Sequence, residues 1–165
     1  MQNNFDELIA LADENDICVD SQVRGTPLPA NRYVMIAAVL VFNSKGNIVL
    51  QRIASHKKWG GLLTYSSAGH VSAGETYEQA AIRETQEEIG INVNLDGLIG
   101  IVPSYKDNKQ IAFHHVFKAF SDGPYNPDPS EIDELDEIRS SDLKRYCQEN
   151  ADAFYPTLLE IIKLL

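Results

Sequence analysis

Apolar residues fall in short runs separated by polar turns, a pattern that favours β-strands in the first third of the chain. The longest run, residues 33–42, is rich in β-branched and aromatic side chains and predicts a central strand. A polar turn at 43–47 leads to a second run at 48–52, which predicts its antiparallel partner. Before them, apolar segments at 8–11 and 17–19 flank a polar turn and predict an N-terminal β-hairpin.

The middle of the chain predicts a loop followed by one well-delimited helix. Residues 57–74 are rich in Gly and Ser and show no clear period, so we expect mostly loop with short extended pieces. The helix is expected over 76–89, with Thr76 as its N-cap and Gln79 completing a capping box. Gly90 stands where a C-terminal glycine would end this helix.

The last part of the chain mixes strands, loop and helices. Strands are expected at about 91–105 and 110–120, followed by an acidic, Pro-rich loop over 121–136. Helical segments are expected after Ser141 and from Pro156, because proline is favoured in the first turn of a helix. Without regular βαβ alternation, the order of elements predicts an α/β protein of the α+β kind, with a mixed sheet and helices on its faces.

Length and composition are those of one globular domain. The chain has 165 residues, of which 44% are hydrophobic and 23% are charged, so it can bury a core without cross-links. We expect a single domain over 1–165, with a hairpin and linker at 1–30, the core at 31–145 and a C-terminal helical segment at 146–165. No apolar run approaches the roughly 20 residues that span a bilayer, and the acidic N-terminus lacks the basic region of a secretory signal.

The charge balance argues against a nucleic-acid polymer as partner. Twenty-four acids against fourteen bases give a formal net charge of −10, whereas proteins that grip a phosphate backbone are normally basic. No Asp or Glu occurs between Asp20 and Glu75, and acids dominate from Glu75 onward. This asymmetry reflects either chance and solubility or a basic surface for an anionic ligand beside a carboxylate site for a metal. Cys18 and Cys147 support neither a disulfide framework nor a zinc site, so we expect a cytoplasmic protein.

Three glutamates on the expected helix are the main candidates for chemistry. At about 100° per residue, Glu84, Glu87 and Glu88 share one wedge of the helix surface. The apolar side next to this wedge is expected to comprise Ala81, Ile82, Thr85 and Ile89. A solvated acidic face is one interpretation of the glutamates. The other is that their carboxylates converge on a hard divalent cation, which prefers oxygen ligands.

The residues around these acids resemble the Nudix box, G-x5-E-x7-R-E-U-x-E-E-x-G-U, in which U is a bulky aliphatic residue. Here Gly69 and Glu75 precede the run Arg83-Glu84-Thr85-Gln86-Glu87-Glu88-Ile89-Gly90-Ile91 at that spacing. Every glycine, acid and arginine of the pattern is present. Thr85 departs from it at the first U position, where we expect a softer core contact and an intact site.

The resemblance to the Nudix hydrolase family implies an α/β/α sandwich around a mixed sheet, with the box forming a loop–helix–loop. It also implies hydrolysis of a nucleoside diphosphate derivative or a similar small diphosphate by water, with Mg²⁺ or Mn²⁺ as cofactor. By match to the box, Glu84, Glu87 and Glu88 would bind the metal and activate water. The backbone carbonyl of Gly69 would join the metal shell.

Other residues of the box have supporting roles by the same resemblance. Arg83, placed with the catalytic set, and Glu75 would brace the loop against the helix, while Gly74 and Gly90 would support the ends of the box. The general base is left open between the box and a later loop, where the candidates are Glu131, Asp133 and Glu134. The oligomeric state is also open, and a homodimer is compatible with the family.

A narrower resemblance points to the branch of the family that includes isopentenyl diphosphate isomerases. It rests on residues 46–52, 57–60 and 67–71, together with the N-terminal hairpin. Candidate substrate contacts, each with an ordinary packing or surface role as the alternative, are Arg52, Lys57, Trp59 and His70. Two further histidines, His114 and His115, share one expected strand, whose alternation sends them to opposite faces.

Two positions separate a hydrolase from an isomerase. The resemblance implies that an isomerase moves protons with a cysteine just before the Gly-His pair and a glutamate on a later strand. Ala68 and Ala112 stand at these positions, and a methyl group cannot exchange a proton. We therefore expect a metal-dependent pyrophosphohydrolase, with an isomerase or a non-catalytic nucleotide-binding module as alternatives. Retention of all three box acids argues against the binding module.

Overall fold

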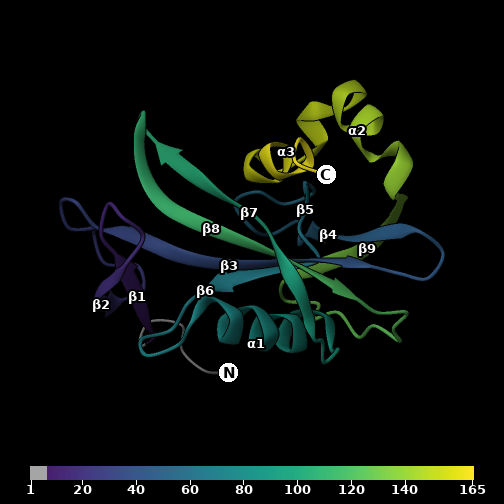
Figure 1. Ribbon diagram of the computed structural model, residues 1–165. Helices are drawn as coiled ribbons and strands as arrows, with labels where there is room; N and C mark the ends of the chain where they lie inside the picture. The colour runs from purple at the N-terminus through teal and green to yellow at the C-terminus, as the bar shows by residue number, and fades with distance from the viewer. Residues whose placement is uncertain (1–6) are drawn as a thin grey trace.

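The computed structural model describes residues 7–165, and it places helices on both faces of a mixed sheet (Figure 1). In chain order the elements are β1 (Leu8–Ala12), β2 (Cys18–Val23), β3 (Tyr33–Phe42), β4 (Asn47–Ile53), β5 (Leu63–Thr64), β6 (Ser67–His70), α1 (Tyr77–Ile89), β7 (Leu95–Lys106), β8 (Lys109–Phe120), β9 (Ile132–Arg139), α2 (Ser140–Glu149), a 3₁₀ turn (Ala151–Ala153) and α3 (Pro156–Ile162). Among these, no helix is long and apolar enough to cross a membrane.

Strand β3 is the centre of the nine-stranded sheet. It pairs in parallel with β8 from Val34 to Phe42, and on its other side it pairs antiparallel with β1, β6 and β4 in turn. The outer strands extend the sheet, because β2 pairs with β1, β7 with β8, and both β5 and β9 with β4. The mixed sheet expected from the sequence is confirmed.

Alternation along β3 divides the interior into two cores, one on each face of the sheet. Ala37, Val39 and Val41 belong to the core between the sheet and α1. Ala38 and Leu40 belong to the core on the opposite face, to which residues of α2 and α3 contribute. Figure 1 shows this arrangement, with α1 below the sheet and α2 and α3 above it. A strand buried on both faces reads as a continuous apolar run, as this one does.

Helix α1 begins and ends as its sequence predicts. Thr76 and Gln79 form the capping box, and Gly90 ends the helix in the left-handed conformation at φ 73°. The expected apolar side was wrong at Ile82, which is 39% exposed. The helix is rotated so that Glu88 is buried instead, since its buried residues are Tyr77, Ala80, Ala81, Thr85, Glu88 and Ile89.

The acidic segment near residue 135 is a strand, where a loop was expected over 121–136. Strand β9 pairs with the whole of β4, although Asp and Glu are poor strand formers. Partners on β4 compensate, because Arg52 forms ion pairs with Glu134 and Asp136. The expected strand at 91–105 is also corrected, since β7 begins at Leu95.

The N-terminal hairpin is confirmed, and it continues the main sheet through the pairing of Leu11 with Val34. Its turn is attached to the body of the protein by Asp16. The Asp16 carboxylate accepts a hydrogen bond from the Tyr77 hydroxyl at 2.5 Å and lies 2.5 Å from Nε2 of His115. The Tyr77 and His115 rings stack with centroids 3.4 Å apart. These contacts connect the hairpin to α1 and β8.

Candidate active site

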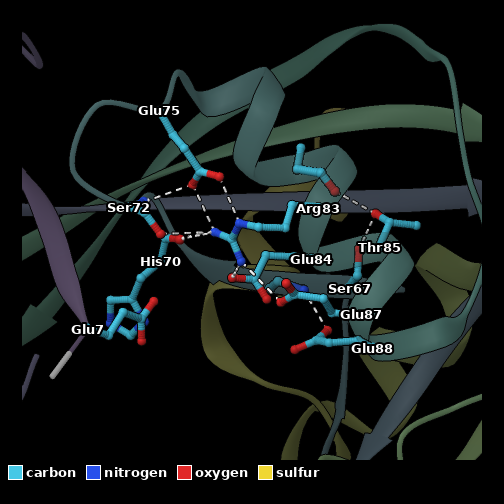
Figure 2. Close-up of polar contacts among 12 residues, drawn as sticks. Glu7, Ser67, His70, Ser72, Glu75, Arg83, Glu84, Thr85, Glu87 and Glu88 are labelled. Atoms are coloured by element: carbon cyan, nitrogen blue, oxygen red, sulfur yellow. Dashed lines mark hydrogen bonds and ion pairs between the residues drawn. The ribbon is translucent and has the colours of Figure 1, made fainter. Parts of the chain in front are cut away.

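Arg83, in the middle of α1, is the centre of a polar network (Figure 2). Its guanidinium donates to both carboxylate oxygens of Glu75, at 2.8 and 2.9 Å, and to the backbone carbonyl of His70 at 2.9 Å. It also donates to Glu84 at 2.7 Å and to Glu87 at 3.2 Å. These bonds lower the pKa of Glu75 and fasten the loop after β6 to the helix. The bracing that the resemblance implies for Arg83 and Glu75 agrees with this geometry.

Glu84 lies directly against Gly69. A Cβ atom at position 69 would be 2.0 Å from Cδ of Glu84 and 2.1 Å from its Oε1, so only a glycine leaves room for this carboxylate. Burial raises the pKa of Glu84, and its ion pair with Arg83 opposes that effect. Two residues that the resemblance assigns to the metal shell are therefore in close contact.

Glu88 is the most buried of the three box acids, with only 8% of the residue exposed. Its Oε2 accepts a hydrogen bond from the backbone N–H of Ala68 at 3.0 Å and one from the Gln51 amide at 3.3 Å. Burial raises the pKa of Glu88 to about 8, although the bond from Ala68 favours the charged form. A cation beside this carboxyl would favour its charged form and so lower its pKa.

The oxygen atoms around α1 are suitable ligands for a hard divalent cation. Glu84, Glu87, Glu88 and the carbonyl of Gly69 offer only oxygen, which Mg²⁺ and Mn²⁺ prefer. In residues 7–165, no three acidic, His or Cys side chains stand ready as a metal cluster. Arg83 donates hydrogen bonds to Glu84 and Glu87, and a bound ion would compete with it for these carboxylates.

Thr85, the departure from the box pattern, is fully buried and makes two hydrogen bonds. Its hydroxyl donates to the carbonyl of Ala81 at 2.7 Å and lies 2.6 Å from the hydroxyl of Ser67. Thr85 therefore joins α1 to β6 through polar contacts, in place of the aliphatic packing that the pattern prescribes.

The three box acids open onto a cavity of about 660 Å³, whose lining also includes residues of β3, β4, β6 and β8. Of the four expected substrate contacts, His70 and Lys57 line this cavity. Arg52 does not, because it points to the other side of β4 and pairs with Glu134 and Asp136. Trp59 also lies outside the lining and packs edge-to-face on Tyr155, with ring centroids 5.7 Å apart.

The three candidates for a general base are separated by the structure. Glu131 lines the cavity and forms an ion pair with Lys57. Asp133 accepts a hydrogen bond from the backbone of Ser55 at 2.9 Å, and Glu134 pairs with Arg52 outside the cavity. Of these three acids, only Glu131 is placed beside the box acids.

The sequence analysis missed several lining residues, most of them on the sheet. Gln51 and Tyr65 line the cavity with uncharged polar side chains, and Glu7 and Arg24 reach it from the N-terminal hairpin. Of the two histidines that strand alternation was expected to send to opposite faces, His114 lines the cavity and His115 does not. No local signal identified Gln51 or Tyr65, because their positions depend on how β4, β5 and α1 meet.

The NUDIX domain profile matches residues 32–158, most of the chain. The chain belongs to the Nudix family. An isopentenyl-diphosphate Delta-isomerase of Corynebacterium diphtheriae is 31% identical over 168 residues, which cover 93% of this chain and 90% of that protein. An uncharacterised Nudix hydrolase of Nostoc sp. is 33% identical over 132 residues, or 77% and 76% of the two chains.

Solved structures agree with this Nudix fold. A protein from Deinococcus radiodurans superposes with a TM-score of 0.77 at 24% identity, covering 95% of this chain and 98% of that one. The MutT protein of Methanosarcina mazei superposes with a TM-score of 0.67 at 18% identity, covering 84% and 94%. At these identities the likeness concerns the fold alone, and the α/β/α sandwich with a mixed sheet is confirmed.

Proposed function

We propose that this Nudix protein is a divalent-metal-dependent hydrolase that cleaves a phosphoanhydride bond in a nucleoside diphosphate derivative or a similar small diphosphate. The observation that carries the proposal is the joint placement of Glu84, Glu87 and Glu88 at one cavity with Gly69. Lys57 and Arg24 line the same cavity and supply positive charge for an anionic substrate.

Gly69, Glu84, Glu87 and Glu88 are the residues that would hold Mg²⁺ or Mn²⁺. Such an ion neutralises a diphosphate and lowers the pKa of water near it. Arg83 acts as a positioning residue, because it orients two of the acids and ties them to Glu75. Glu131 is the candidate outside the box that can accept a proton from water, since it faces the same cavity.

Isomerisation of an isoprenoid diphosphate is the second candidate, favoured by the 31% identity to the Corynebacterium enzyme. Two side chains oppose it. Ala68 lines the cavity just before Gly69 and His70, and Ala112 is buried on the same side of β8 as His114. Neither methyl group can donate or accept a proton, whereas hydrolysis needs no group at either position.

A phosphate-release screen tests the proposal directly, with inorganic pyrophosphatase added for the nucleoside triphosphates and alkaline phosphatase for the nucleotide sugars and dinucleotides. The added enzymes are needed because cleavage of these compounds first yields pyrophosphate or phosphomonoesters. Nucleoside di- and triphosphates, nucleotide sugars, dinucleotides and isopentenyl diphosphate would each be incubated with the protein and Mg²⁺. We expect release from one or more of the nucleotide compounds, and loss of that release in Glu88→Gln. Absence of release from every compound, or equal release by Glu88→Gln, contradicts the proposal.

A further inference from the structure

The Asp16 carboxylate, in the turn of the N-terminal hairpin, contacts two side chains of the body of the protein. Its Oδ1 accepts a hydrogen bond from the Tyr77 hydroxyl at 2.5 Å, and its Oδ2 lies 2.5 Å from Nε2 of His115. Tyr77 is the first residue of α1 and is buried, and its ring stacks on that of His115, so both partners are fixed in place. Asp13, by contrast, closes the turn itself, because its carboxylate accepts two backbone N–H groups within the turn. Asp16 thus joins the hairpin to the box helix.

Strand β2, which follows this turn, is much less firmly held than β1. The interior of β1 is buried, and β1 is also hydrogen-bonded to β3 and to the carbonyl of Val71. Five of the six residues of β2 are exposed, and within residues 7–165 it pairs only with β1. Burial therefore does little to select one register for β2, and strands of this kind are prone to slip. A shift of one residue sends every side chain of a strand to the opposite face.

Arg24, directly after β2, depends on that register to reach the cavity. Its backbone N–H donates to the carbonyl of Glu7 at 2.8 Å, and its guanidinium donates to the Glu7 carboxylate at 3.0 Å. Both residues line the cavity together with His70, and Figure 2 shows Glu7 next to His70. If β2 were shifted by one residue against β1, Arg24 would face away from Glu7 and from the cavity.

We propose that Asp16 is a positioning residue for Arg24: it holds the hairpin turn against α1 and β8, fixes the register of β2, and so keeps the guanidinium at the cavity for an anionic ligand. The inference rests on the proposed function, in which Arg24 supplies positive charge for a diphosphate. Asp16 is not part of the cavity lining, so its effect on a ligand passes through the hairpin.

The backbone at Asp16 allows a clean substitution. Its φ is 61°, a left-handed conformation that glycine adopts freely, so Asp16→Gly removes both side-chain contacts without straining the turn. Asp16→Asn is the conservative variant, because asparagine tolerates this conformation and keeps an oxygen that accepts from Tyr77. Asp107→Gly is the matched control, since Asp107 is an exposed aspartate at φ 51° in the β7–β8 turn, outside the cavity lining.

Calorimetry in Mg²⁺ would measure the affinity for imidodiphosphate, a pyrophosphate analogue that resists hydrolysis. We expect Arg24→Gln to bind it about tenfold more weakly than wild type, the size expected for one charged hydrogen bond, and Asp16→Gly at least about threefold more weakly. The double variant should bind no more weakly than Arg24→Gln alone, because both changes act on one contact. Asp16→Asn should restore part of the affinity, and Asp107→Gly should leave it unchanged.

Amide hydrogen exchange gives a second readout that needs no ligand. Exchange along β2 and at the Arg24 N–H should be faster in Asp16→Gly than in wild type or Asp107→Gly. If Asp16→Gly melts below the assay temperature, Tyr77→Phe takes its place, because it removes only the hydroxyl that Asp16 binds.

Wild-type affinity or wild-type exchange in Asp16→Gly overturns the inference. So does a double variant whose loss is the product of the two single losses, because Asp16 then acts independently of Arg24. Absence of imidodiphosphate binding by the wild-type protein also overturns it, since Arg24 then has no anionic ligand. A protein that shows the expected differences but hydrolyses nothing refutes the proposed function alone. A hydrolase in which Asp16→Gly binds as wild type does refutes this inference alone.

Discussion

The carboxylate of Glu84 occupies the space that a side chain at Gly69 would need, with Cδ only 2.0 Å from the ideal Cβ position. This contact brings the first acid of the box helix onto the backbone of β6. The clash concerns the far end of a side chain and not backbone, so the protein can relieve it by moving Glu84 alone.

Gly69→Ala is therefore expected to lower activity while the protein still folds. The added methyl displaces the Glu84 carboxylate, and misplacement of a catalytic group by about 1 Å can cost on the order of 100-fold in rate. Steady-state phosphate release and a thermal melt would be measured side by side. A Gly69→Ala variant that works at the wild-type rate would show that the contact has no catalytic value.

Gly60→Ala is the matched comparison, because its Cβ would meet backbone atoms of Ser55 at 2.6 and 2.7 Å. The backbone cannot give way as a side-chain end can, so this variant should melt at lower temperature. Gly69→Ala should not show the same loss.

Glu88→Gln separates catalysis from stability. The Glu88 carboxyl is 8% exposed and burial raises its pKa to about 8, so it is largely neutral near pH 7 without metal. A neutral amide in its place should therefore leave the metal-free variant no less stable than wild type. Turnover should fall by orders of magnitude. Glu78→Gln, which neutralises an exposed acid in the first turn of the same helix, should leave turnover unchanged and cost at most about 1 kcal/mol of stability.

Activity should depend on Mg²⁺ or Mn²⁺, because the box presents only oxygen donors. After metal stripping, excess EDTA should abolish phosphate release, and added Mg²⁺ should restore it. Mg²⁺ should also raise the melting temperature of wild type more than that of Glu88→Gln. Full turnover in EDTA would rule out the metal requirement.

Isopentenyl and dimethylallyl diphosphate should not interconvert. Ala68 and Ala112 offer no proton donor or acceptor at the positions where the isomerases are expected to have them. The protein would be incubated with isopentenyl diphosphate in D₂O and followed by NMR. Deuterium entering the substrate at a catalytic rate would support the isomerase instead.

Stability should decrease as the pH falls below about 6.5, in part because of His114. Burial lowers its folded pKa to about 4, below the unfolded value of 6.5. Between these two pKa values the unfolded chain binds a proton on His114 that the folded state does not bind. The free energy of unfolding therefore falls by up to about 1.4 kcal/mol for each pH unit. Denaturant unfolding between pH 4 and 7 should show a shallower slope for His114→Phe than for wild type. Identical slopes would show that His114 is protonated in the folded protein.

The sequence alone determined the elements whose signals are local. The caps of α1 lie within the helix ends, since Thr76, Gln79 and Gly90 act on their own backbone. The apolar run of β3 is long enough to be a central strand in any arrangement. The box acids and their spacing likewise lie within one loop and one helix, which is why the family resemblance could be read from short range.

Tertiary structure decided whatever depends on two distant segments meeting. Strand β9 forms from an acidic segment because β4 offers it backbone hydrogen bonds and the ion pairs of Arg52. The same ion pairs hold Arg52 away from the cavity. Helix α1 is rotated by its packing so that Glu88 is buried and Ile82 is exposed. His114 on β8 and Tyr65, between β5 and β6, have ring centroids 6.4 Å apart although they are distant in the chain. Such contacts depend on the packing of strands far apart in the chain, and no pattern within a single segment specifies that packing.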